Sequence, residues 1–88
     1  MMTKMLEAMF EEKHDFYEYL EMYEECSDAT IKTKLYTIME QESHHYKELM
    51  DIIFKEDPSR SLSHMEKAMH KQASKWYEGM VSKLKTIK

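Results

Sequence analysis

Apolar side chains recur at intervals of three and four residues through most of this chain. That interval is the repeat of an α-helix with one buried face, so it predicts amphipathic helices. The 88 residues include one glycine and one proline, and the turn signals of β-hairpins are therefore absent. We predict an all-α fold with helices at about 3–25, 29–55 and 61–85.

Short polar residues mark the start and end of the second helix. Ser27 or Asp28 is a suitable N-cap, because a short oxygen side chain accepts hydrogen bonds from free backbone N–H groups. Asp57-Pro58 ends the same helix, since proline disfavours helical backbone in the residue before it.

The third helix has three candidate caps, Ser59, Ser61 and Ser63. Ser63 with Glu66 fits the capping box, in which each side chain bonds the other residue's backbone N–H. The connections between helices are short, so consecutive helices are expected to be antiparallel neighbours. We therefore expect residues 1–88 to form one helical domain, made of an antiparallel hairpin and a third helix.

Charge is divided unevenly along the chain. Residues 1–57 carry six lysines and fifteen acidic residues, for a net −9, whereas residues 58–88 carry seven basic and two acidic residues, for +5. The basic third segment could pack beside the acidic first two, in the same chain or in a partner. Lys67, Lys71 and Lys75 form one row at helical spacing, which is typical of a solvated helix face. No nucleic-acid partner is expected.

Three features bear on where the protein works. No apolar run approaches the roughly 18 residues needed to span a membrane, so no membrane partner is expected. Acidic residues follow Met1 within a few positions, which is unlike a secretory signal. Cys26 is the single cysteine and fits a reducing compartment. We therefore expect a cytoplasmic protein.

The second helix carries an acidic residue inside its apolar stripe. The stripe consists of Ile31, Leu35, Ile38, Tyr46, Leu49 and Ile53. At about 100° per residue, Glu42 falls near the middle of this stripe, and His45 falls near one edge. A buried carboxylate costs roughly several kcal/mol unless it is paired or bound to a metal. The partner of Glu42 therefore decides what the protein does.

Folding the first helix back on the second about Ser27 places Glu12 level with Glu42, each about 22 Å from the turn. One hairpin can then present Glu12, Glu42 and His45 together. Two carboxylates and an imidazole are a suitable ligand set for Fe²⁺, Mn²⁺ or Zn²⁺. Di-iron bundles use two such sets, so two hairpins related by a two-fold axis would complete both the site and a four-helix bundle. We therefore expect a homodimer or a larger homo-oligomer.

These residues resemble a known family. Glu12, the aromatic residues after it and the Glu42-Ser43-His44-His45 string are similar to the ferritin-like superfamily, over the stretch from Met9 to Asp51. The closest resemblance is to the small encapsulated ferritins, in which one hairpin dimerises to complete a di-iron site. The resemblance implies that Glu12, Glu42 and His45 ligate iron, with Glu42 or Glu12 bridging the two metals. It also implies oxidation of Fe²⁺ by O₂ or peroxide.

The same family has acidic residues flanking the first ligand, which form an outer metal-entry site. Glu11 matches one of those positions, whereas His14 stands where the family usually has Glu. Glu11 and His14 also repeat the Glu-x-x-His spacing, but they project away from the apolar face, so we interpret them as solvated.

A metal-free arrangement is also open. Lys13 lies on the apolar face of the first helix, about one residue from the level of Glu42. A buried Lys13–Glu42 ion pair would satisfy the carboxylate without metal, although such pairs contribute little net stability. The chain would then be a helical oligomerisation or adaptor module that binds a partner through its methionine-rich face and basic third helix.

Overall fold

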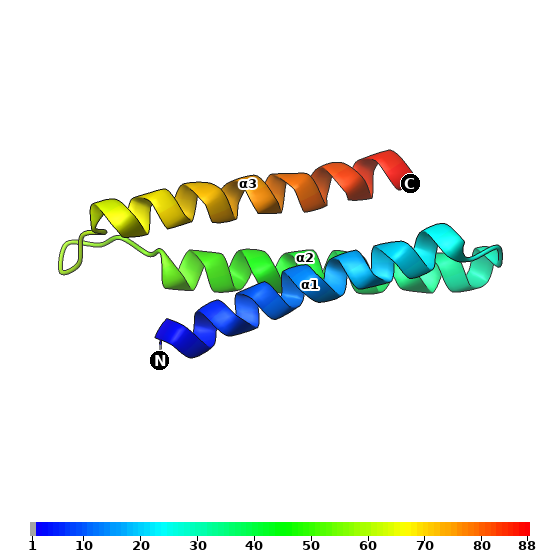
Figure 1. The fold of residues 1–88 in the computed structure, drawn as a ribbon, viewed down its shortest axis with the longest axis horizontal. Coiled ribbons are helices and arrows are strands. Elements are labelled where there is room, and N and C mark those ends of the chain that lie inside the picture. Colours follow the sequence, from blue (N-terminus) through cyan, green and yellow to red (C-terminus); the bar gives the residue numbers. More distant parts are fainter. Residues whose placement is uncertain (1) are drawn as a thin grey trace.

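The computed structural model describes residues 2–88, which form three helices and no strand. The helices are α1 (Met2–Glu25), α2 (Ala29–Ile53) and α3 (His64–Ile87). Each helix runs antiparallel to the one before it, so α1 and α3 run in the same direction (Figure 1). The predicted all-α fold is confirmed for these residues. None of the three helices is long and apolar enough to cross a membrane.

Side-chain caps begin the second and third helices. An Asp28 carboxylate oxygen accepts a hydrogen bond of 3.0 Å from the backbone N–H of Ile31. Ser63 and Glu66 form the capping box, and each side chain accepts a 3.1 Å bond from the other residue's backbone N–H. Both caps satisfy N–H groups that the first turn of a helix leaves without partners.

The connection between α2 and α3 is longer than the sequence predicts. α2 ends at Ile53 and α3 begins at His64, whereas the expected ends were near 55 and 61. Between them, Asp57 and Arg60 exchange backbone hydrogen bonds of 2.9 and 3.0 Å. This tight turn uses backbone groups that would otherwise extend either helix.

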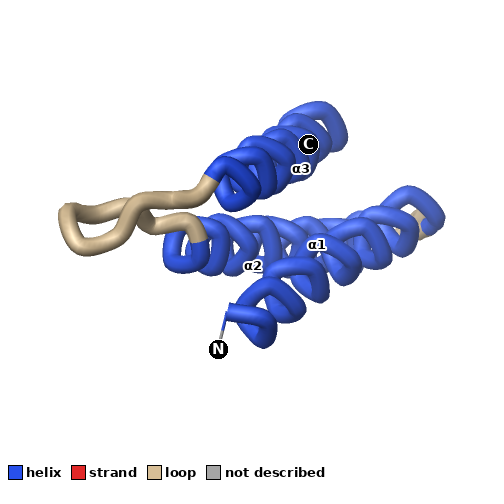
Figure 2. Tube along the Cα trace, turned by 60° about the vertical axis from the view of Figure 1, so that its left-hand side comes forward, coloured by secondary structure: helices blue, strands red, loops and turns tan. Residues whose placement is uncertain are grey.

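α2 lies between the other two helices. α1 packs closely along α2, while α3 packs on a different side of α2 and meets α1 at few places. Figure 2 shows α3 standing apart from α1. Two tyrosine hydroxyls join α2 to α3, because Tyr46 donates to the carbonyl of Ala73 at 2.7 Å and Tyr36 to that of Leu84 at 2.8 Å.

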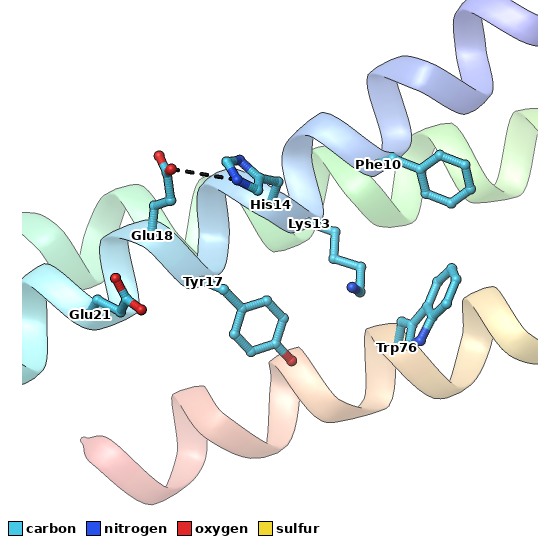
Figure 3. Close-up of a pocket in the computed structure, with 7 residues that line it drawn as sticks. All are labelled: Phe10, Lys13, His14, Tyr17, Glu18, Glu21 and Trp76. Atoms are coloured by element: carbon cyan, nitrogen blue, oxygen red, sulfur yellow. Dashed lines mark ion pairs between the residues drawn. The ribbon is translucent and has the colours of Figure 1, made fainter.

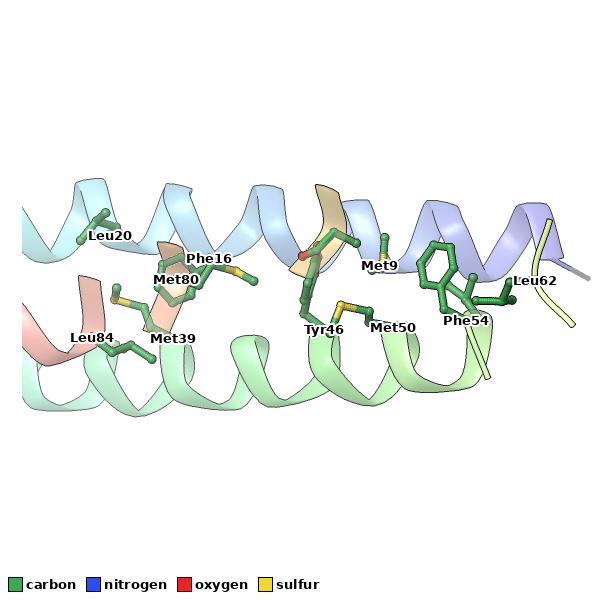
Figure 4. Close-up of a cluster of buried hydrophobic side chains, with 12 residues drawn as sticks. Met9, Phe16, Leu20, Met39, Tyr46, Met50, Phe54, Leu62, Met80 and Leu84 are labelled. Carbon is green, nitrogen blue, oxygen red and sulfur yellow. The ribbon is translucent and has the colours of Figure 1, made fainter. Parts of the chain in front are cut away.

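The core is a row of buried apolar side chains between α1 and α2, covered on one side by α3 (Figure 4). Its members are Met9, Phe16, Leu20, Met39, Tyr46, Met50, Ile53, Phe54, Leu62, Ala73, Met80 and Leu84. Four of them are methionines, whose flexible side chains fill the irregular gaps between helices. This packing sets the orientation of α1 against α2 and hence the position of Glu42.

Candidate metal centre

Glu42 is a buried carboxylate with an unsatisfied oxygen. Only 9% of its surface is exposed, and its Oε2 atom has no hydrogen-bond partner. On the same helix, Met39 and Tyr46 lie three residues before it and four after it, and both are fully buried. These neighbours draw Glu42 into the core. Within residues 2–88, no other buried side-chain nitrogen or oxygen lacks a partner.

The surroundings of Glu42 disfavour its charged form. Removal from water is the largest cause, and repulsion from Asp15, Glu12 and Glu18 adds to it, so the pKa of Glu42 rises to about 7. The three repelling residues lie on α1 at intervals of three, which places them along one side of that helix. Among residues 2–88, no lysine or arginine pairs with Glu42 to offset this repulsion.

Glu12 and His45 lie beside Glu42. The Nδ1 atom of His45 is 3.7 Å from Oε1 of Glu12, which joins α2 to α1. Their side chains are 55% and 27% exposed, so these groups reach the surface of the hairpin. The structure thus brings all three predicted ligands to one level. Their ligand atoms do not all lie within 4.8 Å of one another. They form an open half-site, and their role as ligands stays a prediction.

The Lys13–Glu42 ion pair of the metal-free alternative is not formed. The ammonium of Lys13 lies instead 4.8 Å from the ring centroid of Trp76 and 5.7 Å from that of Tyr17, in the space between α1 and α3 (Figure 3). Among residues 2–88, the lysine and arginine ion pairs are confined to Lys47–Asp51 and Arg60–Glu66. Glu12 and Lys13 are consecutive residues of α1 and therefore project about 100° apart. Glu12 faces α2, so Lys13 is level with Glu42 but turned towards α3.

We expect Lys13→Met to leave the pH dependence of stability unchanged, because Lys13 does not contact Glu42. The lost attraction to the aromatic rings should lower the free energy of unfolding by about 1 kcal/mol or less. Breaking a buried ion pair would instead cost about 3–5 kcal/mol. Urea unfolding at about pH 5 and pH 8 distinguishes the two. A loss of the larger size, present only at the higher pH, would restore the ion-pair interpretation.

A second group of possible ligands lies exposed on α1. His14, Asp15 and Glu18 place one ligand atom each within 4.8 Å of one another. His14 is 3.7 Å from Asp15 and 3.5 Å from Glu18. Polar residues one turn apart commonly meet on a solvated helix face, as expected for His14. Asp15 and Glu18 were not predicted as neighbours of Glu42, although their three-residue spacing from Glu12 indicates a common side of the helix.

Apolar side chains of α2 flank the half-site. Ile38 lies one turn before Glu42 and Leu49 one turn after His45, and both are partly exposed. Further along the same side of α2, Ile31 and Ile52 are 51% and 58% exposed. We call this surface the hairpin face and define it by Ile31, Ile38, Leu49 and Ile52 with the three candidate ligands. α3 packs on a different side of α2 and does not cover it.

No family model, curated protein or solved structure matches this chain. The resemblance to the ferritin-like superfamily therefore rests on Glu12 and the string from Glu42 to His45.

Proposed function

We propose that this chain is a ferritin-like metal-binding protein that acts as a homodimer. Two hairpin faces would meet about a two-fold axis and hold two metal ions between them. Each copy would contribute Glu12, Glu42 and His45. The observation that supports this proposal is the buried, unpartnered Oε2 atom of Glu42, since a metal ion would be the cation that no lysine or arginine of residues 2–88 supplies.

Charge balance favours two divalent cations. Glu12 and Glu42 from both copies would bring four negative ligand charges into one interface, which two divalent ions balance. Without cations, the same arrangement would oppose like charges in a desolvated site, which is strongly unfavourable. Metal ions require a deprotonated Glu42 and would therefore lower its pKa.

The donor set suits iron. Each metal would have several carboxylate oxygens and one imidazole nitrogen, a combination that also accommodates Mn²⁺ and Zn²⁺. With Fe²⁺ as the substrate, the carboxylates would stabilise Fe³⁺ over Fe²⁺ because of their negative charge. Each Fe²⁺ would lose one electron, and O₂ or peroxide would accept the electrons. Ferroxidase activity is therefore the enzymatic activity that we propose.

A second candidate function is a metal-free oligomerisation or adaptor module. The exposed Ile31 and Ile52 favour this candidate, because an apolar surface promotes association whether or not metal is present. The Lys13–Glu42 pair, which would satisfy the carboxylate in such a module, is not formed. In the metal-binding dimer Glu42 would ligate a metal ion, whereas in the adaptor module it would bind none.

Elemental analysis of the purified protein, combined with its mass in solution, tests the proposal. We expect close to one iron, manganese or zinc per chain and a mass of at least two chains. Glu42→Ala should remove the metal, whereas Glu40→Ala, an exposed position on the same helix, should retain it. Metal-free protein whose melting temperature ignores added Fe²⁺, Mn²⁺ and Zn²⁺ would overturn the proposal and favour the adaptor module.

A further inference from the structure

The side of α1 that carries Phe10 and Tyr17 borders a groove. This open groove runs along α1 beside Trp76 of α3 and has a volume of about 610 Å³. Figure 3 shows three aromatic side chains around it, with two carboxylates towards one end. The lining residues are Phe10, Lys13, His14, Tyr17, Glu18, Glu21 and Trp76.

The groove exists because α1 and α3 meet at few points. Phe10 packs edge-on against Trp76 with ring centroids 5.9 Å apart, yet 43% of Phe10 stays exposed. Further along, Tyr17 approaches Gly79, where an added Cβ would lie 3.6 Å from the tyrosine hydroxyl. Met69, which lines a small apolar pocket beside Phe10, is 37% exposed. An exposed aromatic surface of this kind is typical of an interface.

The two helices that border the groove carry opposite charge. α1 has eight acidic and two basic residues, whereas α3 has five lysines and two acidic residues. Within residues 2–88, no ion pair joins these helices. Glu21 lies one turn after Tyr17, and Lys83 lies one turn after Gly79, so these two charges stand at the same level. Their complementarity is unused in the single chain.

We propose that a second copy of this chain covers the groove, packing face to face about a two-fold axis parallel to the helices. This axis places each acidic α1 opposite the partner's basic α3, so that the four helices alternate in charge. It also keeps Glu21 level with Lys83 of the partner subunit. A two-fold axis perpendicular to the helices would instead stack α1 on α1 and α3 on α3, which like charges disfavour.

This second interface lies mostly on another side of α1 from the metal-bearing one, although Glu18 lines the groove and also repels Glu42. Glu12 and Phe10 project from α1 about 160° apart, given about 100° per residue. The hairpin face and the groove can therefore be covered at the same time, and two different two-fold contacts build assemblies larger than a dimer. The groove contact needs no metal and does not depend on the proposed function.

Charge exchange in metal-free protein tests the groove interface. In the presence of a chelator, the wild-type chain should form a dimer in sedimentation equilibrium. Glu21→Lys and Lys83→Glu should each raise the dissociation constant of the dimer about tenfold, because the two-fold axis repeats the contact and each variant loses two ion pairs. An equimolar mixture of the two variants should recover wild-type affinity as a heterodimer, since each new lysine then faces a new glutamate.

Lys67→Glu provides the matched control, because it makes the same charge change on a side of α3 away from Gly79 and Trp76. It should leave the dissociation constant within about twofold of wild type. Circular dichroism confirms that each variant stays helical. A monomeric wild-type chain, unaffected dimerisation by the two groove variants, or a mixture that fails to associate would each overturn the proposal.

Discussion

In metal-free protein, Glu42→Gln should raise the free energy of unfolding at about pH 8 by about 2–3 kcal/mol. The folded chain holds Glu42 with a pKa of about 7, against an ordinary value of 4.5. A raised pKa means that the folded state binds more protons than the unfolded state between these values. Stability from Glu42 is therefore full below about pH 4.5 and is lost as the pH rises through 7.

Glutamine resembles the neutral acid in shape and cannot ionise, so the variant should lose this part of the pH dependence. Urea unfolding at about pH 5 and pH 8, with a chelator present, measures the effect. Glu40→Gln on the exposed side of α2 is the control and should follow wild type at both pH values. A variant as pH-dependent as wild type would show that Glu42 ionises freely in the folded chain.

Added metal should have the second large effect. At a hundredfold excess over its dissociation constant, Mn²⁺ should stabilise the wild-type protein by about 2.7 kcal/mol. Mn²⁺ is the better probe because it avoids the oxidation expected of Fe²⁺. The stabilisation should diminish below about pH 7, since the ion must displace the proton of Glu42. Thermal unfolding across pH, with and without Mn²⁺, measures both effects.

Neighbouring histidines provide the matched comparison. His45→Ala should abolish most of the metal stabilisation because it removes the nitrogen ligand. His44→Ala should preserve it, because His44 is exposed and pairs with Glu48 at 2.9 Å. Equal losses in the two variants would mean that the ions bind the acidic surface without a defined site.

The predicted effect of Glu42→Gln on the free energy of unfolding has opposite signs with and without metal. Glu42→Gln should stabilise the metal-free chain and remove the response to metal. A purely structural glutamate would not produce this combination, since removing a useful hydrogen bond or ion pair destabilises under both conditions. Measuring the one variant in both states therefore separates the metal centre from the adaptor module.

Much of the fold follows from local chemistry that the sequence displays. Asp28 and Ser63 cap their helices because capping depends on a few consecutive residues. The periodicity predicted that Glu42 is buried, but the buried side of α2 runs through Met39 and Tyr46, whereas Ile31 of the predicted stripe is 51% exposed. The extra length of the connection before α3 was not predicted, because the turn formed by Asp57 and Arg60 competes with both helix ends.

The sequence predicted which residues of the candidate site lie at the same height along the hairpin, but not the side to which each of them projects. Counting residues from the turn places Glu12 beside Glu42, and the contact between Glu12 and His45 agrees with that level. The same count placed Lys13 there as well. Its actual direction depends on where α3 packs, because Trp76 supplies the aromatic surface on which the ammonium rests.

The sequence by itself determined three helices, the caps that begin the second and third, and a carboxylate that must be buried, because periodicity and capping act over a few residues. Only the tertiary structure decided which charges Glu42 meets. Packing α3 on one side of α2 turned Lys13 away and left the hairpin face open. Glu42 was therefore left among Glu12, Asp15 and Glu18, and no lysine or arginine of residues 2–88 pairs with it. Such contacts join residues far apart in the chain, so they depend on how helices are oriented rather than on how each one forms.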